Sequence, residues 1–126
     1  MPQTEIRLFR TASGQVPVSQ WLDDLQATSP NAFRRCLAAI VALSRSGFEL
    51  RRPLADYLRD GIRELRVKHG RVHYRILYSF DGKNIAILTH GITKKGRVPP
   101  IEIERAIECL NLVRSDREKH TAVFEF

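Results

Sequence analysis

The residues with the clearest chemistry are the basic side chains between residues 59 and 97. This stretch holds ten arginines and lysines against three acidic residues, so its net charge of +7 equals that of the whole 126-residue chain. Arginine and lysine make most protein contacts to phosphate, and a basic excess confined to one stretch indicates a surface that meets a polyanion. The ten basic residues are Arg59, Arg63, Arg66, Lys68, Arg71, Arg75, Lys83, Lys94, Lys95 and Arg97.

The other reactive side chains form no metal or redox motif. The four histidines do not occur with cysteines or acidic residues at the spacing of metal ligands. We therefore expect neither a metal nor a cofactor. Cys36 and Cys109 fall on or beside the apolar side of expected helices, where free cysteine commonly acts as a small core residue. We expect both to be buried, inert thiols.

Length and composition predict one globular domain over residues 1–126. Residues 1–5 lack the charged and apolar regions of a signal peptide. No apolar run approaches the roughly 20 residues that cross a bilayer. We expect no membrane association and a cytoplasmic location.

Hydrophobic periodicity predicts an α+β domain of order βααβββα. Alternation predicts strands at residues 4–10, 62–68, 72–80 and 84–92. Prolines suited to a first helical turn predict helices that begin at Pro17, Pro30 and Pro100. Asp81-Gly82 is a strong hairpin signal, so the last three strands should form an antiparallel meander. Residues 48–58 then form a connector, residues 116–126 a loose tail, and the helices cover one face of a small antiparallel sheet.

Strand alternation also divides the sheet into a core face and an open face. In the strand at 72–80, the even-numbered residues from Val72 to Phe80 are apolar and should pack under the helices. The acidic residues that usually alternate with surface bases are mostly missing from the opposite face, so a merely solvated face is the weaker interpretation. The alternation leaves the direction of His90 open. The basic side chains expected together on the open face are Arg66, Lys68, His73 and Arg75.

Five short motifs follow one another along the chain, and together they resemble a known family. They are residues 17–22 (PVSQWL), 61–66 (GIRELR), 74–78 (YRILY), 88–95 (LTHGITKK) and 100–106 (PIEIERA). In order and spacing they resemble HigB-type toxins of the RelE/ParE superfamily, in the branch common among phage-derived proteins. The resemblance spans roughly residues 4–115.

The resemblance implies a RelE-like fold and a toxin that cleaves mRNA in the ribosomal A site. It also implies a small helix-turn-helix antitoxin as partner. By motif, Arg75 matches the arginine of the central strand and Arg66 the basic position of the preceding strand. Lys94 and Lys95 match the basic positions after the last strand. The chain departs from the RelE archetype near Ile103, where the archetype has a tyrosine.

Cleavage of RNA by its own 2′-hydroxyl requires a base, charge stabilisation at phosphorus and an acid for the leaving oxygen. No metal is required. His90 and His73 are candidates for proton transfer because imidazole titrates near neutrality, although a satisfied histidine at a strand end and a solvated one are the alternatives. The expected catalytic residues are Arg66, Arg75, Lys94, Lys95 and His90. The expected RNA-binding residues are Arg63, Lys68, Arg71, His73 and Arg97.

The sequence thus predicts a metal-independent endoribonuclease that inhibits translation. Two alternatives stay open: a gyrase-inhibiting toxin of the ParE kind, and a non-catalytic nucleic-acid-binding phage protein. The basic set of Arg66, Arg75, Lys94 and Lys95 favours the nuclease, because ParE-type proteins generally lack it.

Overall fold

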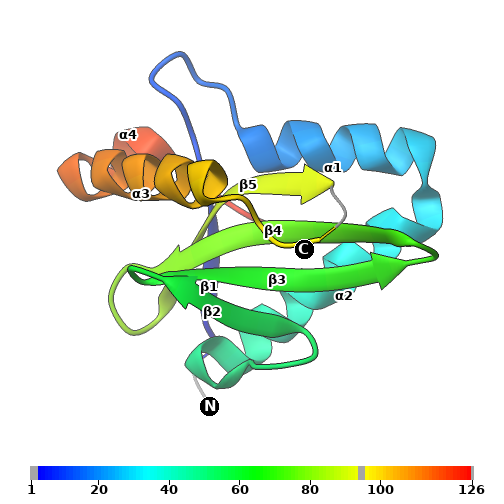
Figure 1. Ribbon diagram of the computed structural model, residues 1–126. Helices are drawn as coiled ribbons and strands as arrows, with labels where there is room; N and C mark the ends of the chain where they lie inside the picture. The colour runs from blue at the N-terminus through cyan, green and yellow to red at the C-terminus, as the bar shows by residue number, and fades with distance from the viewer. Residues whose placement is uncertain (1–2, 94–95, 126) are drawn as a thin grey trace.

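The computed structural model describes residues 3–93 and 96–125, which form one mixed sheet with helices on both faces (Figure 1). The strand order is β2-β3-β4-β5-β1-β6. The elements, in chain order, are β1 (Glu5–Phe9), α1 (Pro17–Thr28), α2 (Pro30–Ser46), the short 3-10 helix η1 (Gly47–Glu49), β2 (Ala55–Arg59), β3 (Ile62–His69), β4 (Val72–Phe80), β5 (Ile85–Thr93), α3 (Pro100–Ser115), α4 (Arg117–His120) and β6 (Thr121–Val123).

The α+β class and the antiparallel meander of β3, β4 and β5 are confirmed. The expected element order and the fully antiparallel sheet are wrong. Residues 48–58 contain most of η1 and of β2, and β2 pairs antiparallel with β3 as an edge strand. β1 runs parallel to β5, because the chain crosses the sheet through α1, α2 and the meander before it returns beside β1.

The expectation that helices cover only one face is also wrong. On one face, α1 and α2 pack over a core that includes Ile76 and Tyr78. On the other, α3 packs over Leu77 and Ile87 (Figure 1). The reason is that β4 and β5 carry large apolar side chains on both sides, and each side must be covered by another layer.

The signals for helix starts were correct, since each of the three long helices has a proline in its first turn. Cys36 and Cys109 are free and buried, as expected. Burial raises the pKa of the Cys36 thiol to about 12 and that of Cys109 to about 11, so both are protonated at neutral pH.

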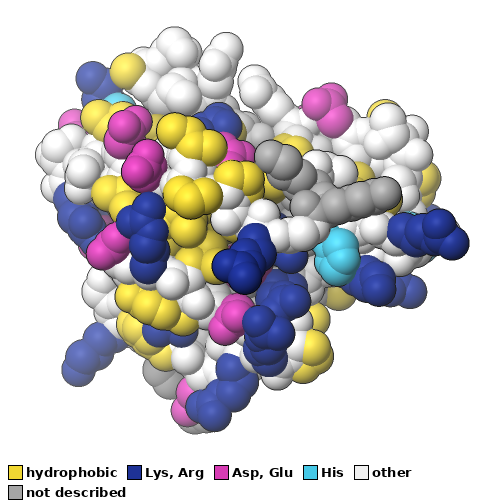
Figure 2. Space-filling model, in the orientation of Figure 1, with side chains coloured by type: hydrophobic (Ala, Val, Ile, Leu, Met, Phe, Trp, Pro, Cys, Tyr) yellow, Lys and Arg dark blue, Asp and Glu magenta, His cyan; other side chains and the backbone are white. Residues whose placement is uncertain are grey.

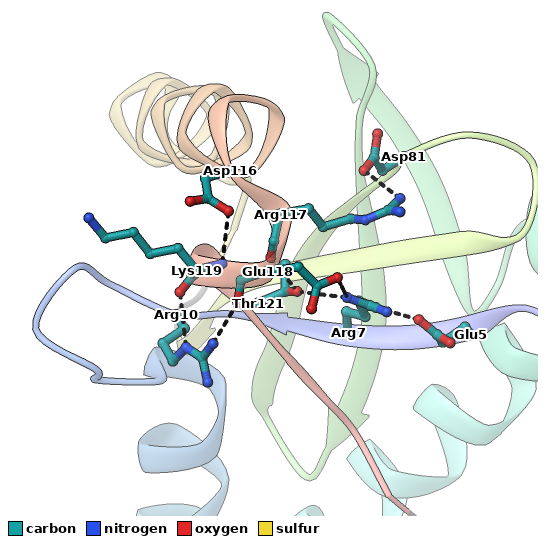
Figure 3. A network of polar contacts seen from close by, with 9 residues as sticks. All are labelled: Glu5, Arg7, Arg10, Asp81, Asp116, Arg117, Glu118, Lys119 and Thr121. Carbon is teal, nitrogen blue, oxygen red and sulfur yellow. Dashed lines mark hydrogen bonds and ion pairs between the residues drawn. The ribbon is translucent and has the colours of Figure 1, made fainter.

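The segment expected to be a loose tail forms α4 and β6 instead, and β6 pairs with β1. Arg10 donates hydrogen bonds to the backbone carbonyls of Lys119 (3.0 Å) and Glu118 (2.7 Å), as Figure 3 shows. Arg117 lies 3.3 Å from Asp81 in the turn after β4. These contacts join the end of the chain to its first strand and to the turn after β4. No helix in the described part of the chain is long and apolar enough to span a membrane.

Candidate functional site

A cleft of about 530 Å³ opens where β2, β3 and β4 meet the segment that leads into α3. Arginine and lysine side chains gather over this part of the sheet, beside α3 (Figure 2). Val98, Ile103 and Leu58 provide an apolar side, while charged groups provide the rest. The charged residues that line the cleft are Arg52, Asp56, Arg59, Glu64, Arg66, Arg75 and Arg97.

An ion pair between Arg75 and Glu64 lies in the cleft wall. The Nε atom of Arg75 is 2.8 Å from Oε1 of Glu64, and the two side chains are only 10% and 8% exposed. Neither atom has a hydrogen-bond partner among the described residues, so this contact is an ion pair with poor hydrogen-bond geometry. Arg75 also donates through Nη1 to the carbonyl oxygen of Gly96. Its guanidinium is therefore held in one position.

The strand register explains why these groups meet. Arg66 pairs with Arg75 across β3 and β4, and Asp56 pairs with Glu64 across β2 and β3. All four residues lie on the same face of the sheet, since side chains two apart in a strand point the same way. The cleft therefore has two arginines and two carboxylates from three adjacent strands.

The two carboxylates have pKa values displaced in opposite directions. Burial raises the pKa of Glu64, although the charges of Arg75 and Arg66 oppose that rise. Hydrogen bonds from Arg52 (3.1 and 2.8 Å to Oδ2) lower the pKa of Asp56. Two carboxyl groups with separated pKa values can play different roles in proton transfer.

Arg66 is the more accessible of the two expected catalytic arginines. Its side chain is 26% exposed, and its Nη1 lies 3.9 Å from Oδ2 of Asp56, at the limit of an ion pair. The structure therefore brings Arg66, Arg75 and Arg97 to one cleft. Lys94 and Lys95 lie outside the described residues.

The open face predicted from the strands is only partly open. Arg75 is buried, because the segment around Gly96 and Val98 covers it, and α3 covers Leu77 farther along β4. Lys68 and His73 pair across β3 and β4, two residues beyond Arg66 and Arg75, and continue the same face toward solvent.

Two other expected RNA-binding residues do not reach the cleft. Arg71 is exposed in the turn between β3 and β4. Arg63 lies on the opposite face of β3, with its guanidinium over the rings of Phe48, Tyr57 and Phe80.

His90 is buried and does not line the cleft. Thr89 is an extra residue in β5, because His90 pairs with Leu77 while Leu88 pairs with Tyr78. This bulge turns His90 toward α3, where its Nε2 lies 3.7 Å from Oε1 of Glu102. Burial lowers the pKa of His90 to about 4, so the imidazole is neutral at pH 7.

Three residues of the cleft were not predicted as functional from the sequence: Glu64, Asp56 and Arg52. A signal for Glu64 was present: it is a single acidic residue between two basic ones in a strand, and it alternates onto the face of Arg66. Asp56 and Arg52 gave no comparable signal, because they belong to the stretch predicted as a connector. No group of three possible metal ligands occurs within residues 3–93 and 96–125.

Comparison with known families shows which family the chain resembles. The model of the family described as phage derived protein Gp49-like (DUF891) matches residues 21–111. That span includes strands β2 to β5, most of α3 and every residue that lines the cleft. No curated protein sequence matches the chain.

Proposed function

The chain belongs to the family of Gp49-like phage-derived proteins, and from this premise we propose that it is a toxin that cleaves mRNA on the ribosome. The observation that carries the proposal is the buried Arg75–Glu64 pair in a cleft lined by five arginines. The motifs that resemble HigB-type toxins contain both residues of the pair and Arg66.

The arginines of the cleft suit a phosphodiester. A guanidinium group presents several N–H donors in a plane that matches phosphate oxygens. Arg75 is fixed by Glu64 and Gly96, so it needs no rearrangement when charge develops on phosphorus. Arg66 is more exposed and has only a long contact to Asp56, so it is free to turn to a phosphate.

Glu64 is the group that best fits the role of general base. A base works best when its pKa approaches the working pH, and burial shifts the pKa of Glu64 in that direction. In this scheme, Glu64 takes the proton of the 2′-hydroxyl, and the 2′-oxygen attacks phosphorus. The bond from phosphorus to the 5′-oxygen breaks, which leaves a 2′,3′-cyclic phosphate. The 5′-oxygen takes its proton from water or from a ribosomal group, since no described histidine lines the cleft.

Glu64→Gln tests the assignment, because it keeps the shape of the side chain and removes the base. We expect mRNA cleavage to fall by about 10²- to 10⁴-fold. Primer extension on a translated reporter measures it, and cuts should fall within codons. Glu104→Gln is the matched control, because Glu104 is exposed on α3 and does not line the cleft.

A Glu64→Gln variant that cleaves as fast as the unaltered chain would refute the role of Glu64. Intact mRNA together with accumulating cleaved gyrase–DNA complexes would refute the nuclease and support a ParE-like toxin. RNA binding without any cleavage would support a non-catalytic phage protein.

A toxin of this kind requires an inhibitor in the same cell. The proposal therefore includes a small helix-turn-helix antitoxin and a cytoplasmic site of action, where the ribosome is. Co-expression of the neighbouring reading frame should restore growth to cells that produce the chain.

A further inference from the structure

Three aromatic rings form a cluster on the side of β2 and β3 that faces away from the cleft. Phe48 of η1 stacks on Phe80 at the end of β4, with ring centroids 3.8 Å apart. Tyr57 of β2 lies close by, since the same arginine contacts all three rings. Phe48 and Tyr57 are 52% and 51% exposed, which leaves ring surface open to solvent. We call these three residues the aromatic platform.

Arg63 completes the aromatic platform. Its guanidinium carbon lies 5.4 Å from the ring centroid of Tyr57, 5.6 Å from that of Phe80 and 5.7 Å from that of Phe48. These distances are in the range of cation–π contacts. Arg63 forms no ion pair with an acidic side chain in the described part of the chain. Its planar cation therefore stays available to a further ligand.

The aromatic platform and the cleft are separated only by the outermost strand. Tyr57 lines the cleft and also two adjoining hollows of about 330 and 240 Å³. Arg51 and Arg52 line the first hollow, and Arg114 lines the second. A single-stranded chain that leaves the cleft can cross β2 and reach the rings, because β2 is the edge strand and no strand of the described residues lies beyond it.

We propose that the aromatic platform is a base-binding subsite, at which an unpaired base of single-stranded RNA stacks on Phe48, Tyr57 or the guanidinium plane of Arg63. Single-stranded nucleic acids bind where exposed rings and arginines lie along a positive groove, and this surface has both. The subsite deepens the proposed function, since the stacked base would neighbour the nucleotide held in the cleft.

A protein partner is the competing occupant, because tyrosine and arginine are also frequent at the centres of protein interfaces. The charge of the surroundings favours RNA. The hollow next to Phe48 has two arginines and no acidic residue in its lining. The other hollow has three arginines and one acidic residue, Asp56, which is already bonded to Arg52.

The test measures the affinity of the whole chain for a short single-stranded RNA made uncleavable by 2′-deoxy nucleotides and labelled with 2-aminopurine. We expect Phe48→Ala to weaken binding by about 5- to 140-fold and to abolish the quenching that stacking causes. Phe48→Tyr, which keeps a ring, should bind normally. Ile101→Ala is the matched control, because Ile101 is an exposed apolar residue that lines none of these hollows. Thermal unfolding confirms that each variant is folded.

Unchanged affinity and quenching in both Phe48→Ala and Tyr57→Ala would overturn the subsite. So would normal RNA binding together with weaker binding of the antitoxin, which would assign the rings to the protein partner. The outcome for cleavage is separate. If Phe48→Ala loses RNA binding while the unaltered chain cuts no mRNA, the subsite stands and the nuclease fails. If cleavage depends on Glu64 but RNA binding ignores Phe48, the nuclease stands and the subsite fails.

Discussion

Replacing Arg75 with alanine should destabilise the fold much more than replacing Arg66, although both arginines line the same cleft. The two arginines differ in burial and in which of their partners loses its contacts when the arginine is removed. Without Arg75, the Glu64 carboxylate remains buried with no cation at 2.8 Å, and the Gly96 carbonyl loses its donor. Without Arg66, Asp56 still accepts two hydrogen bonds from Arg52.

The expected costs follow from these contacts. Removing one partner of a buried ion pair costs about 3–5 kcal/mol. Domains of this size have a free energy of unfolding of roughly 5–15 kcal/mol, so Arg75→Ala should remove a large part of it. An ion pair as long and as accessible as Arg66–Asp56 contributes no more than about 1 kcal/mol. Arg66→Ala should therefore fold normally.

The cost of Arg75→Ala should also depend on pH. The pKa of Glu64 is raised in the folded protein, and Arg75 opposes that rise, so the variant has a still higher pKa. The fold then binds a proton that the unfolded chain releases above roughly pH 4.3. This proton binding by Glu64 stabilises the folded variant at low pH, and the stabilisation is lost as pH rises through the pKa of Glu64 in the folded state. The deficit relative to the unaltered chain should be largest at neutral pH and should shrink toward pH 4.

Urea unfolding followed by the fluorescence of Trp21, the single tryptophan, measures these free energies. Adding Glu64→Gln to Arg75→Ala should recover part of the loss, with a coupling of about 0.5–3 kcal/mol. Equal stability of Arg75→Ala and Arg66→Ala, or a deficit that does not change with pH, would refute the reasoning. Both variants should lose about 10²- to 10³-fold in cleavage rate, so toxicity alone does not separate them.

Three further predictions concern other parts of the chain. The His90 ring should titrate near pH 4 by NMR. The free energy of unfolding should fall as pH drops from about 6.5 toward 4, because the unfolded chain binds the proton at a higher pH than the folded protein does. His90→Gln should remove this pH dependence. Gly91→Ala should cost about 1–3 kcal/mol in urea unfolding, because a Cβ there overlaps the ring of Trp21. Replacing Lys94 and Lys95 with alanine should lower the log–log salt slope of RNA binding by roughly 0.7–0.9 per lost phosphate contact. Weaker antitoxin binding with unchanged RNA binding would instead assign these two lysines to the protein partner.

The parts of the fold that were predicted correctly depend on local signals. The Asp81-Gly82 turn and the prolines at Pro17, Pro30 and Pro100 act within a few residues of where they stand, so the meander and the helix starts follow from them. The parallel pairing of β1 with β5 joins residues about eighty positions apart, and no short pattern encodes it. The position of α3 had one signal in the sequence, which is Leu77. This apolar residue lies on the face of β4 that was predicted to be open and basic, and an apolar side chain there requires a covering element.

A single inserted residue decides the position of His90. Simple alternation over β5 groups His90 with Ala86, Leu88 and Ile92, but the extra Thr89 sends Leu88 and His90 to opposite faces. A bulge of this kind reverses every side chain beyond it relative to those before it. Alternation alone does not locate a bulge, so the candidate base was assigned to a buried histidine and the carboxylate of Glu64 was overlooked.

The basic stretch shows most clearly what charge predicts and what it does not. The number of arginines in this stretch predicts a basic patch, and Arg66, Arg75 and Arg97 do line one cleft. Net charge does not distinguish Arg63 from Arg66. The two residues lie three positions apart in β3, so their side chains point to opposite faces of the sheet. One arginine lines a cleft that suits a phosphate, and the other lies over three rings that suit a base. Strand parity divides the basic patch into these two surfaces, and the edge strand β2 joins them.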